Sequence, residues 1–162
     1  MTAQSFDFGV IGAGIVGLAM ANRLRELHPD AKIAVFDKET SVGQHASGRN
    51  SGVMHAGFYY SPDSLKAALT RDGNQLLREF CASEGIAIKQ TGKVVVTQTE
   101  AEVKVLHELH RRGTANGVIT EIVSAEQLSE LEPLARTEQV ALWSPNTAVA
   151  NPLEVTQALA NK

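Results

Sequence analysis

The stretch that decides the fold is Phe8–Asp37, FGVIGAGIVGLAMANRLRELHPDAKIAVFD. Residues 6–11 alternate and then become continuously apolar, as buried parallel strands do, and 32–36 are predicted to form a second strand. Between them, apolar residues recur at helical spacing as far as Leu27, before His28-Pro29 ends the pattern. The sequence therefore predicts a βαβ unit with two adjacent parallel strands, and an α/β fold.

The turn between the first strand and the helix carries the motif G-x-G-x-x-G, and Asp37 ends the second strand. In this context the motif is a dinucleotide-binding signature: glycines allow a tight turn and close approach of a pyrophosphate, and the helix N-terminus attracts phosphate. Asp37 is expected to accept hydrogen bonds from a ribose diol and, with Lys38-Glu39 following, to disfavour a 2′-phosphate. The alternative is a glycine-rich turn without a ligand. The candidate residues are Gly12, Ala13, Gly14, Ile15, Val16, Gly17, Asp37 and Lys38.

A long segment without regular periodicity follows, and its most informative part is His45–Tyr60, HASGRNSGVMHAGFYY. An NAD-type unit would continue with a second helix and a third parallel strand, so this loop favours FAD. Its small and polar residues allow the backbone to approach a large ligand, and some can cap a short helix directed at the pyrophosphate. The expected cofactor-binding residues of the loop are Ser47, Arg49, Asn50, Ser51 and Gly52.

The remaining sequence predicts mixed helices and strands. Helices are expected at 64–84, 99–116 and 124–131 and from Asn151 to the end, and strands at 86–88, 92–97, 120–123 and 140–143. We divide the chain into the N-terminal part of a cofactor-binding domain (1–85), the start of an α+β substrate or cap domain (86–145) and a return toward the first domain (146–162). Because the chain stops inside a helix, we expect an incomplete fold.

Composition excludes several classes of protein. The 162 residues carry a formal net charge of −3, which does not indicate nucleic-acid binding. The single cysteine, Cys81, excludes a disulfide framework and is expected to be a buried small residue. No apolar run is long enough to span a bilayer. We expect a cytoplasmic protein, with peripheral contact at the inner membrane as an open alternative.

The motifs together resemble a known family. The glycine turn, Asp37 and the loop look like the FAD-dependent oxidoreductases of the D-amino-acid-oxidase superfamily. The longer strings SGRNSGVMHAGFYY, SLKAALTRDGNQLL, GKVVV, LHELHRRGTANGV, LSELEP and ALWSPNTAVANP resemble the branch of L-2-hydroxyglutarate oxidases and dehydrogenases. The resemblance extends from Phe8 to about Ala160. Members of this branch are longer, and they usually have Gly and an acidic residue near the positions of Ala148 and Asn151.

The resemblance implies an enzyme that binds FAD and oxidises the C2 hydroxyl of an L-2-hydroxy acid, L-2-hydroxyglutarate, to a ketone. Electrons would pass from the reduced flavin to oxygen or a quinone. Two alternatives stay open: a related flavoenzyme that acts on an amine, amino acid or glycerol phosphate, and a truncated nucleotide-binding fragment without catalysis. By itself this fragment is expected to be inactive and to expose apolar surface.

Histidines and tyrosines supply the candidates for chemistry. His55 is the candidate catalytic base or substrate-orienting group. The alternative is that His55 only packs beside the flavin. Tyr59 and Tyr60 are candidates for lining the substrate cavity. The alternative is aromatic packing in the core, and we favour this packing role for at least one of them. His45 could tether the flavin, although a loop residue near the cofactor is the preferred interpretation.

A metal site is not expected. His107 and His110 are three residues apart on one predicted helix, but no further ligand completes a set and two arginines follow directly. A solvated polar helix face is the preferred interpretation of this pair.

Overall fold

The computed structural model describes residues 4–162, which form two compact units. The first contains residues 4–52, Ser83–Ala87 and Ala150–Lys162, and the second contains Val53–Ala82 and Ile88–Val149. These units differ from the division expected at residues 85 and 145, because 53–82 groups with the later strands. The assignment of a cofactor-binding and a substrate domain stays a prediction.

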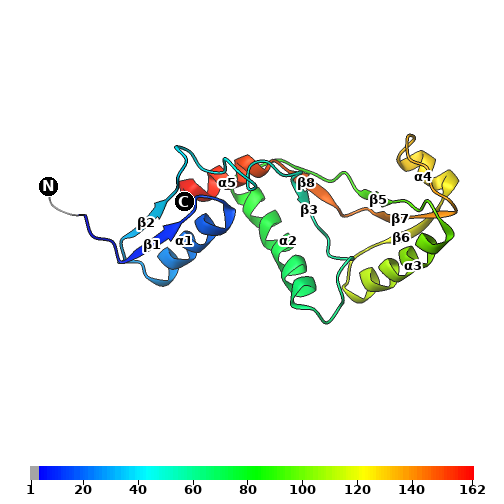
Figure 1. The fold of residues 1–162 in the computed structure, drawn as a ribbon, viewed down its shortest axis with the longest axis horizontal. Coiled ribbons are helices and arrows are strands. Elements are labelled where there is room, and N and C mark those ends of the chain that lie inside the picture. The colour runs from blue at the N-terminus through cyan, green and yellow to red at the C-terminus, as the bar shows by residue number, and fades with distance from the viewer. Residues whose placement is uncertain (1–3) are drawn as a thin grey trace. The chain divides into compact units, whose positions relative to one another are not determined.

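The first unit contains the predicted βαβ arrangement. Strand β1 (Phe8–Ile11) and strand β2 (Ile33–Phe36) pair in parallel, with Phe8 opposite Ile33 and Ile11 opposite Phe36. Helix α1 (Ile15–Leu27) connects them and contacts both strands, as Figure 1 shows. Helix α5 (Pro152–Asn161) lies against α1, where the Asn22 side chain donates a 2.9 Å hydrogen bond to the Leu159 carbonyl. The expected α/β unit is therefore present.

Burial of the first strand was predicted wrongly. Ile11 is 91% exposed and Phe36 is 54% exposed, and β1 begins at Phe8 instead of residue 6. Within residues 4–162 this sheet has two strands, so side chains on the face away from α1 have little to pack against. The expected exposed apolar surface is thus present on this unit, where Val16 and Met20 of α1 are also exposed.

The second unit is built around an antiparallel sheet with the order β5-β7-β6 (Figure 1). Its strands are β5 (Lys93–Val95), β7 (Val140–Ser144) and β6 (Glu121–Ser124). Alternation along β7 separates two cores. Leu142 packs with Phe58 and Leu106 on the face covered by α3 (Glu100–Ala115), and Ala141 packs with Val123 and Leu128 on the face covered by α4 (Ala125–Leu131). Both faces of this sheet are therefore buried.

A smaller sheet has the order β3-β8-β4, and the sequence predicted only part of it. Strands β3 (Val53–Met54) and β8 (Ala148–Ala150) pair antiparallel, with Met54 opposite Ala148. Neither was predicted, because two or three residues are too few to show a strand period. Strand β4 (Ile88–Lys89) lies slightly later than expected, and helix α2 (Leu65–Ser83) lies where a helix was predicted.

Three helices begin at residues whose side chains cap the helix N-terminus. The capping box predicted at Ser124 and Gln127 begins α4, and a second one at Thr99 and Glu102 begins α3. Asn151 caps α5, because its side chain accepts hydrogen bonds from two backbone N–H groups. The asparagine that stands near a usual acidic position of the family therefore has a structural role. None of the helices in residues 4–162 is long and apolar enough to cross a bilayer.

Candidate cofactor-binding site

The glycine-rich turn has the geometry that its sequence predicts. Gly12 has a φ of +106°, a conformation that favours glycine, and its N–H donates a 2.7 Å hydrogen bond to the Phe36 carbonyl. A Cβ on Gly17 would lie 1.9 Å from the Gly12 carbonyl oxygen. Gly12 therefore permits the turn, and Gly17 permits the helix to begin directly beside it.

Asp37 lies at the carboxyl end of β2 and is fastened to this turn. Its carboxylate accepts a 2.6 Å hydrogen bond from the Ala13 N–H and a 2.9 Å hydrogen bond from the Glu39 N–H. These backbone donors, that of Ala13 first, lower the pKa of Asp37 below its ordinary value. The side chain is exposed, and since each carboxylate oxygen has two lone pairs, Asp37 keeps capacity to accept further hydrogen bonds.

An open cavity of about 530 Å³ lies beside Asp37, at the carboxyl ends of the two parallel strands. In open α/β sheets this edge is where ligands bind. Its lining combines apolar residues with a carboxylate, a lysine side chain and a histidine ring. The lining residues are Ile11, Gly12, Phe36, Asp37, Lys38 and His45. The cavity therefore offers an apolar wall for a flat ring and a hydrogen-bond acceptor for a hydroxyl group.

The N-terminus of α1 is next to the turn. The N-cap residue is Gly14, which has no side chain to cap the helix, so the positive end of the helix dipole is not neutralised by its own N-cap. Ser47 partly fulfils this role, because its Oγ accepts a 2.9 Å hydrogen bond from the Ile15 N–H. A Cβ on Gly14 would lie 2.9 Å from the same Oγ, so glycine also makes room for Ser47.

Residues 41–52 form turns instead of the short helix that was expected. The Gly43 N–H donates to the Ala13 carbonyl at 3.1 Å, which joins this loop to the glycine-rich turn. The Asn50 amide donates to the Ala46 and Ser47 carbonyls and accepts from the Gly52 N–H. Side-chain hydrogen bonding of this kind stabilises turns in place of a helix.

The other loop residues predicted to bind cofactor differ in their surroundings. Arg49 and Ser51 are exposed. Gly52 has a φ of +67°, and a Cβ there would lie 2.1 Å from the Ala150 carbonyl oxygen, so glycine is required at this position for structural reasons.

Two residues that line the cavity beside Asp37, and one contact beside it, were missed by sequence reasoning. Ile11 and Phe36 line the cavity, and their place as the last residues of their strands was a usable signal. Glu39 contacts His45 at 2.8 Å and Lys38 at 3.9 Å, a contact no sequence spacing would have revealed.

His55, Tyr59 and Tyr60, which were predicted to take part in chemistry, belong to the second unit. His55 is exposed, and its carbonyl accepts a 3.0 Å hydrogen bond from the Asn74 amide. The Tyr59 and Phe58 ring centroids are 4.3 Å apart, and Tyr59 packs against the core cluster of Phe58, Leu106 and Leu142. Tyr59 therefore has the packing role that we favoured for at least one tyrosine. The Tyr60 ring lies 4.7 Å from the Lys66 ammonium group.

Cys81 lies as the sequence suggested, whereas His110 is half-buried instead of lying on a solvated helix face. Cys81 is fully buried, and burial raises the pKa of its thiol. The His110 Nδ1 is 2.9 Å from the Thr120 hydroxyl. Residues 4–162 contain no group of three or more potential ligands arranged to hold a metal ion.

A parallel βαβ unit with this glycine turn, a helix N-terminus and an acidic residue at the second strand end defines a dinucleotide-binding protein. The particular family follows from comparison. The chain matches the family of FAD dependent oxidoreductases (DAO) over residues 7–162, and it belongs to that family.

Two curated relatives carry the name L-2-hydroxyglutarate dehydrogenase. The chain is 40% identical over 155 residues to an L-2-hydroxyglutarate dehydrogenase of Escherichia coli, covering 96% of this chain and 36% of that protein. It is 39% identical over 160 residues to the mitochondrial L-2-hydroxyglutarate dehydrogenase of Homo sapiens, covering 98% of this chain and 34% of that protein. The chain thus spans about a third of the length of the curated relatives it matches.

Solved structures agree on the fold. An L-α-glycerophosphate oxidase from Mycoplasma pneumoniae with FAD bound superposes with a TM-score of 0.82 at 24% identity, covering 98% of this chain and 42% of the other. An L-proline dehydrogenase from P. horikoshii gives a TM-score of 0.81 at 25% identity, covering 98% and 41%. The predicted fold class, the N-terminal part of an FAD-binding α/β fold, is confirmed.

Proposed function

We propose that this chain is part of an FAD-dependent oxidoreductase that oxidises the C2 hydroxyl of L-2-hydroxyglutarate to a ketone. The observation that carries the proposal is the 40% identity, over nearly the whole chain, to a protein named for that substrate. Electrons would pass on to oxygen or a quinone. Because the chain spans about a third of its relatives, the complete activity belongs to the longer protein.

The proposed pyrophosphate site is the glycine-rich turn. A Cβ position on Gly12 has nothing within 4 Å, so a phosphate has room to approach the backbone there. The N-terminus of α1, whose N-cap residue Gly14 has no side chain, supplies an attractive dipole. The residues present therefore fit the cofactor, and we assign Gly12, Ala13, Gly14, Ile15, Val16 and Gly17 to this contact.

The adenosine half is assigned to the cavity at the strand ends. Asp37 would accept hydrogen bonds from the ribose hydroxyls, since its carboxylate is exposed and its lowered pKa keeps it ionised. Lys38 lines the same cavity, and Ile11 and Phe36 offer apolar surface to a flat ring.

The loop residues complete the proposed cofactor contact. Ser47 is already at the N-terminus of α1, and Asn50 fixes the turn that holds it there. Arg49 and Ser51 are exposed and available to a phosphate or a hydroxyl group, and Gly52 shapes the end of the loop.

Bound FAD would supply the hydride acceptor for the oxidation. For the proton of the substrate hydroxyl we propose His55, acting as base or as the group that orients this hydroxyl. Its backbone is fixed through the Asn74 amide, while its side chain is exposed. We propose Tyr59 and Tyr60 as neighbours of the substrate, with Tyr59 also serving the core.

The test is anaerobic reduction of the FAD-loaded, full-length protein by L-2-hydroxyglutarate, followed as loss of flavin absorbance. Bleaching is expected with this acid and not with its D-enantiomer. Asp37→Ala should weaken FAD binding at least tenfold, whereas Asp30→Ala, at an exposed acidic residue in the turn after α1, should leave FAD binding unchanged. His55→Asn should retain FAD and reduce slowly.

A substrate panel separates the competing functions. Bleaching by glycine, proline or glycerol 3-phosphate but not by a 2-hydroxy acid would replace the substrate and keep the flavoenzyme. Tight FAD binding without reduction by any of these donors would instead support a nucleotide-binding module.

A further inference from the structure

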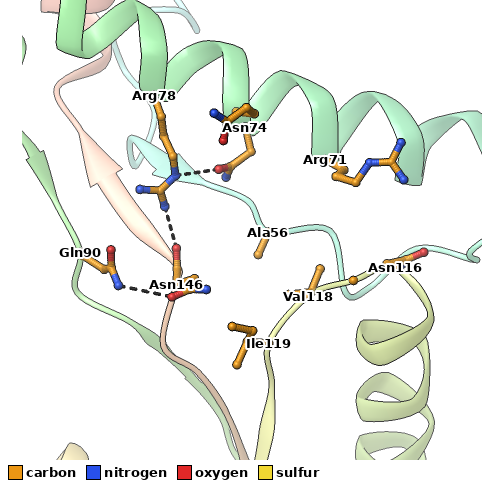
Figure 2. Close-up of a pocket in the computed structure, with 11 residues that line it drawn as sticks. Ala56, Arg71, Asn74, Arg78, Gln90, Asn116, Val118, Ile119 and Asn146 are labelled. Carbon is orange, nitrogen blue, oxygen red and sulfur yellow. Dashed lines mark hydrogen bonds between the residues drawn. The ribbon is translucent and has the colours of Figure 1, made fainter.

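The second unit contains a cavity of about 400 Å³ that the cofactor site does not use (Figure 2). It lies between α2, which contributes Arg78 and Asn74, and the residues after α3, which include Val118 and Ile119. Its volume falls within the range of small-molecule sites, about 300–1,000 Å³.

Arg78 is a charged residue that lines this cavity. Its Nε donates a 2.9 Å hydrogen bond to the Asn74 side-chain oxygen, and its Nη2 donates a 2.7 Å hydrogen bond to the Asn146 carbonyl (Figure 2). Both acceptors are neutral. A guanidinium has five N–H groups, so these two bonds orient Arg78 and leave donors for a further partner.

The charge of Arg78 is not balanced by the protein. Arg78 is half-buried, and no carboxylate forms an ion pair with its guanidinium in residues 4–162. No acidic residue lines the cavity. The other lining arginine, Arg71, is more exposed and already pairs with Asp72 at 2.9 Å. A partly buried cation without a counter-ion favours binding of an anion.

The rest of the lining shows what kind of anion fits. Side-chain amides supply hydrogen-bond donors, among them Gln90, whose amide is 3.4 Å from the Asn146 side-chain oxygen. Ala56, Val118 and Ile119 form an apolar wall. We infer that this cavity binds a small organic anion whose carboxylate pairs with Arg78 and whose hydrocarbon part contacts the apolar wall.

This inference goes beyond the proposed function, because it needs neither flavin nor turnover. The cavity lies within the second unit, which also carries the proposed substrate residues His55, Tyr59 and Tyr60, whereas the proposed pyrophosphate and ribose contacts lie within the first. Anion binding to Arg78 is measured without flavin reduction, so failure of the flavin-reduction test and failure of this inference are distinguishable.

The test is isothermal titration calorimetry of the full-length protein with glutarate, its neutral diamide glutaramide, and inorganic phosphate. Ile119 allows a matched pair of variants because it is 56% exposed and lines the cavity. Ile119→Glu adds a competing carboxylate to the lining of the cavity, and Ile119→Gln adds a side chain of the same shape as Glu without the charge. Arg78→Met removes the cation itself.

Wild type and Ile119→Gln should bind glutarate, and Ile119→Glu and Arg78→Met should bind it at least tenfold more weakly. Glutaramide should give no heat at millimolar concentrations. Equal affinity of Ile119→Glu and Ile119→Gln, or no glutarate binding to wild type, would overturn the inference. Tighter binding of phosphate than of glutarate would overturn the assignment to a carboxylate. Circular dichroism checks that each variant is folded.

Discussion

Gly17→Ala is the sharpest test of the glycine-rich turn. The added Cβ would lie 1.9 Å from the Gly12 carbonyl oxygen, and real contacts of this kind are longer than 3.0 Å. The backbone would have to separate by about 1 Å. Both partners belong to a turn held by the 2.7 Å hydrogen bond from Gly12 to Phe36, so there is no flexible side chain to move aside.

The cost can be estimated. Overpacking costs about 1–3 kcal/mol, and a contact with backbone lies at the upper end of that range. Replacing a helical glycine by alanine stabilises the helix by about 1 kcal/mol, so the free energy of unfolding should fall by about 2 kcal/mol in total. Gly73→Ala is the matched control, since a Cβ on this α2 residue meets nothing within 4 Å and should stabilise by about 1 kcal/mol.

The two variants should therefore differ by about 3 kcal/mol, or roughly 6–12 °C in melting temperature for a domain of this size. Thermal unfolding followed by circular dichroism measures this difference. A fluorescence titration with FAD should show weaker binding for Gly17→Ala alone. Equal melting temperatures, or unchanged FAD affinity in Gly17→Ala, would refute the reasoning.

Three further predictions concern the second unit. Asn116→Ala removes two amide hydrogen bonds to carbonyls of the 57–60 loop and should lower the free energy of unfolding by about 1–3 kcal/mol in urea titrations. Two arginine side chains lower the pKa of Glu108 from 4.5 to about 2, so the stabilisation it gives is complete above pH 4.5 and is lost as pH falls through about 2. Glu108→Gln should flatten the stability profile across that window; an unchanged profile would argue against the ion pair. Thr99→Ala removes a capping box and should cost about 0.5–2 kcal/mol, whereas Thr114→Ala, on the exposed surface of the same helix, should cost less.

Glycine and capping positions were the most predictable parts of this protein. Gly12 adopts the positive φ that a tight turn requires, and Ser124 and Gln127 form the predicted capping box. These features depend on residues close together in the chain, so their chemistry can be recognised from short patterns.

Burial and loop conformation were less predictable. The apolar residues of β1 suggested a buried strand, but Ile11 is exposed, as is Phe36 of β2, because burial depends on what covers a sheet. The polar residues around Asn50 suggested a helix cap, but they form turns, because their side chains bond the local backbone carbonyls instead.

The sequence by itself determined the βαβ unit, the identity of its glycine turn and the acidic residue that ends its second strand. Only the tertiary structure brought Asp37 to the Ala13 N–H and Ser47 to the Ile15 N–H, contacts that join residues 24 and 32 positions apart. It also placed Arg78 beside Asn146, 68 positions away, without a carboxylate partner. Local patterns record turn and helix geometry, whereas the partner of a charged group is decided by how distant segments pack.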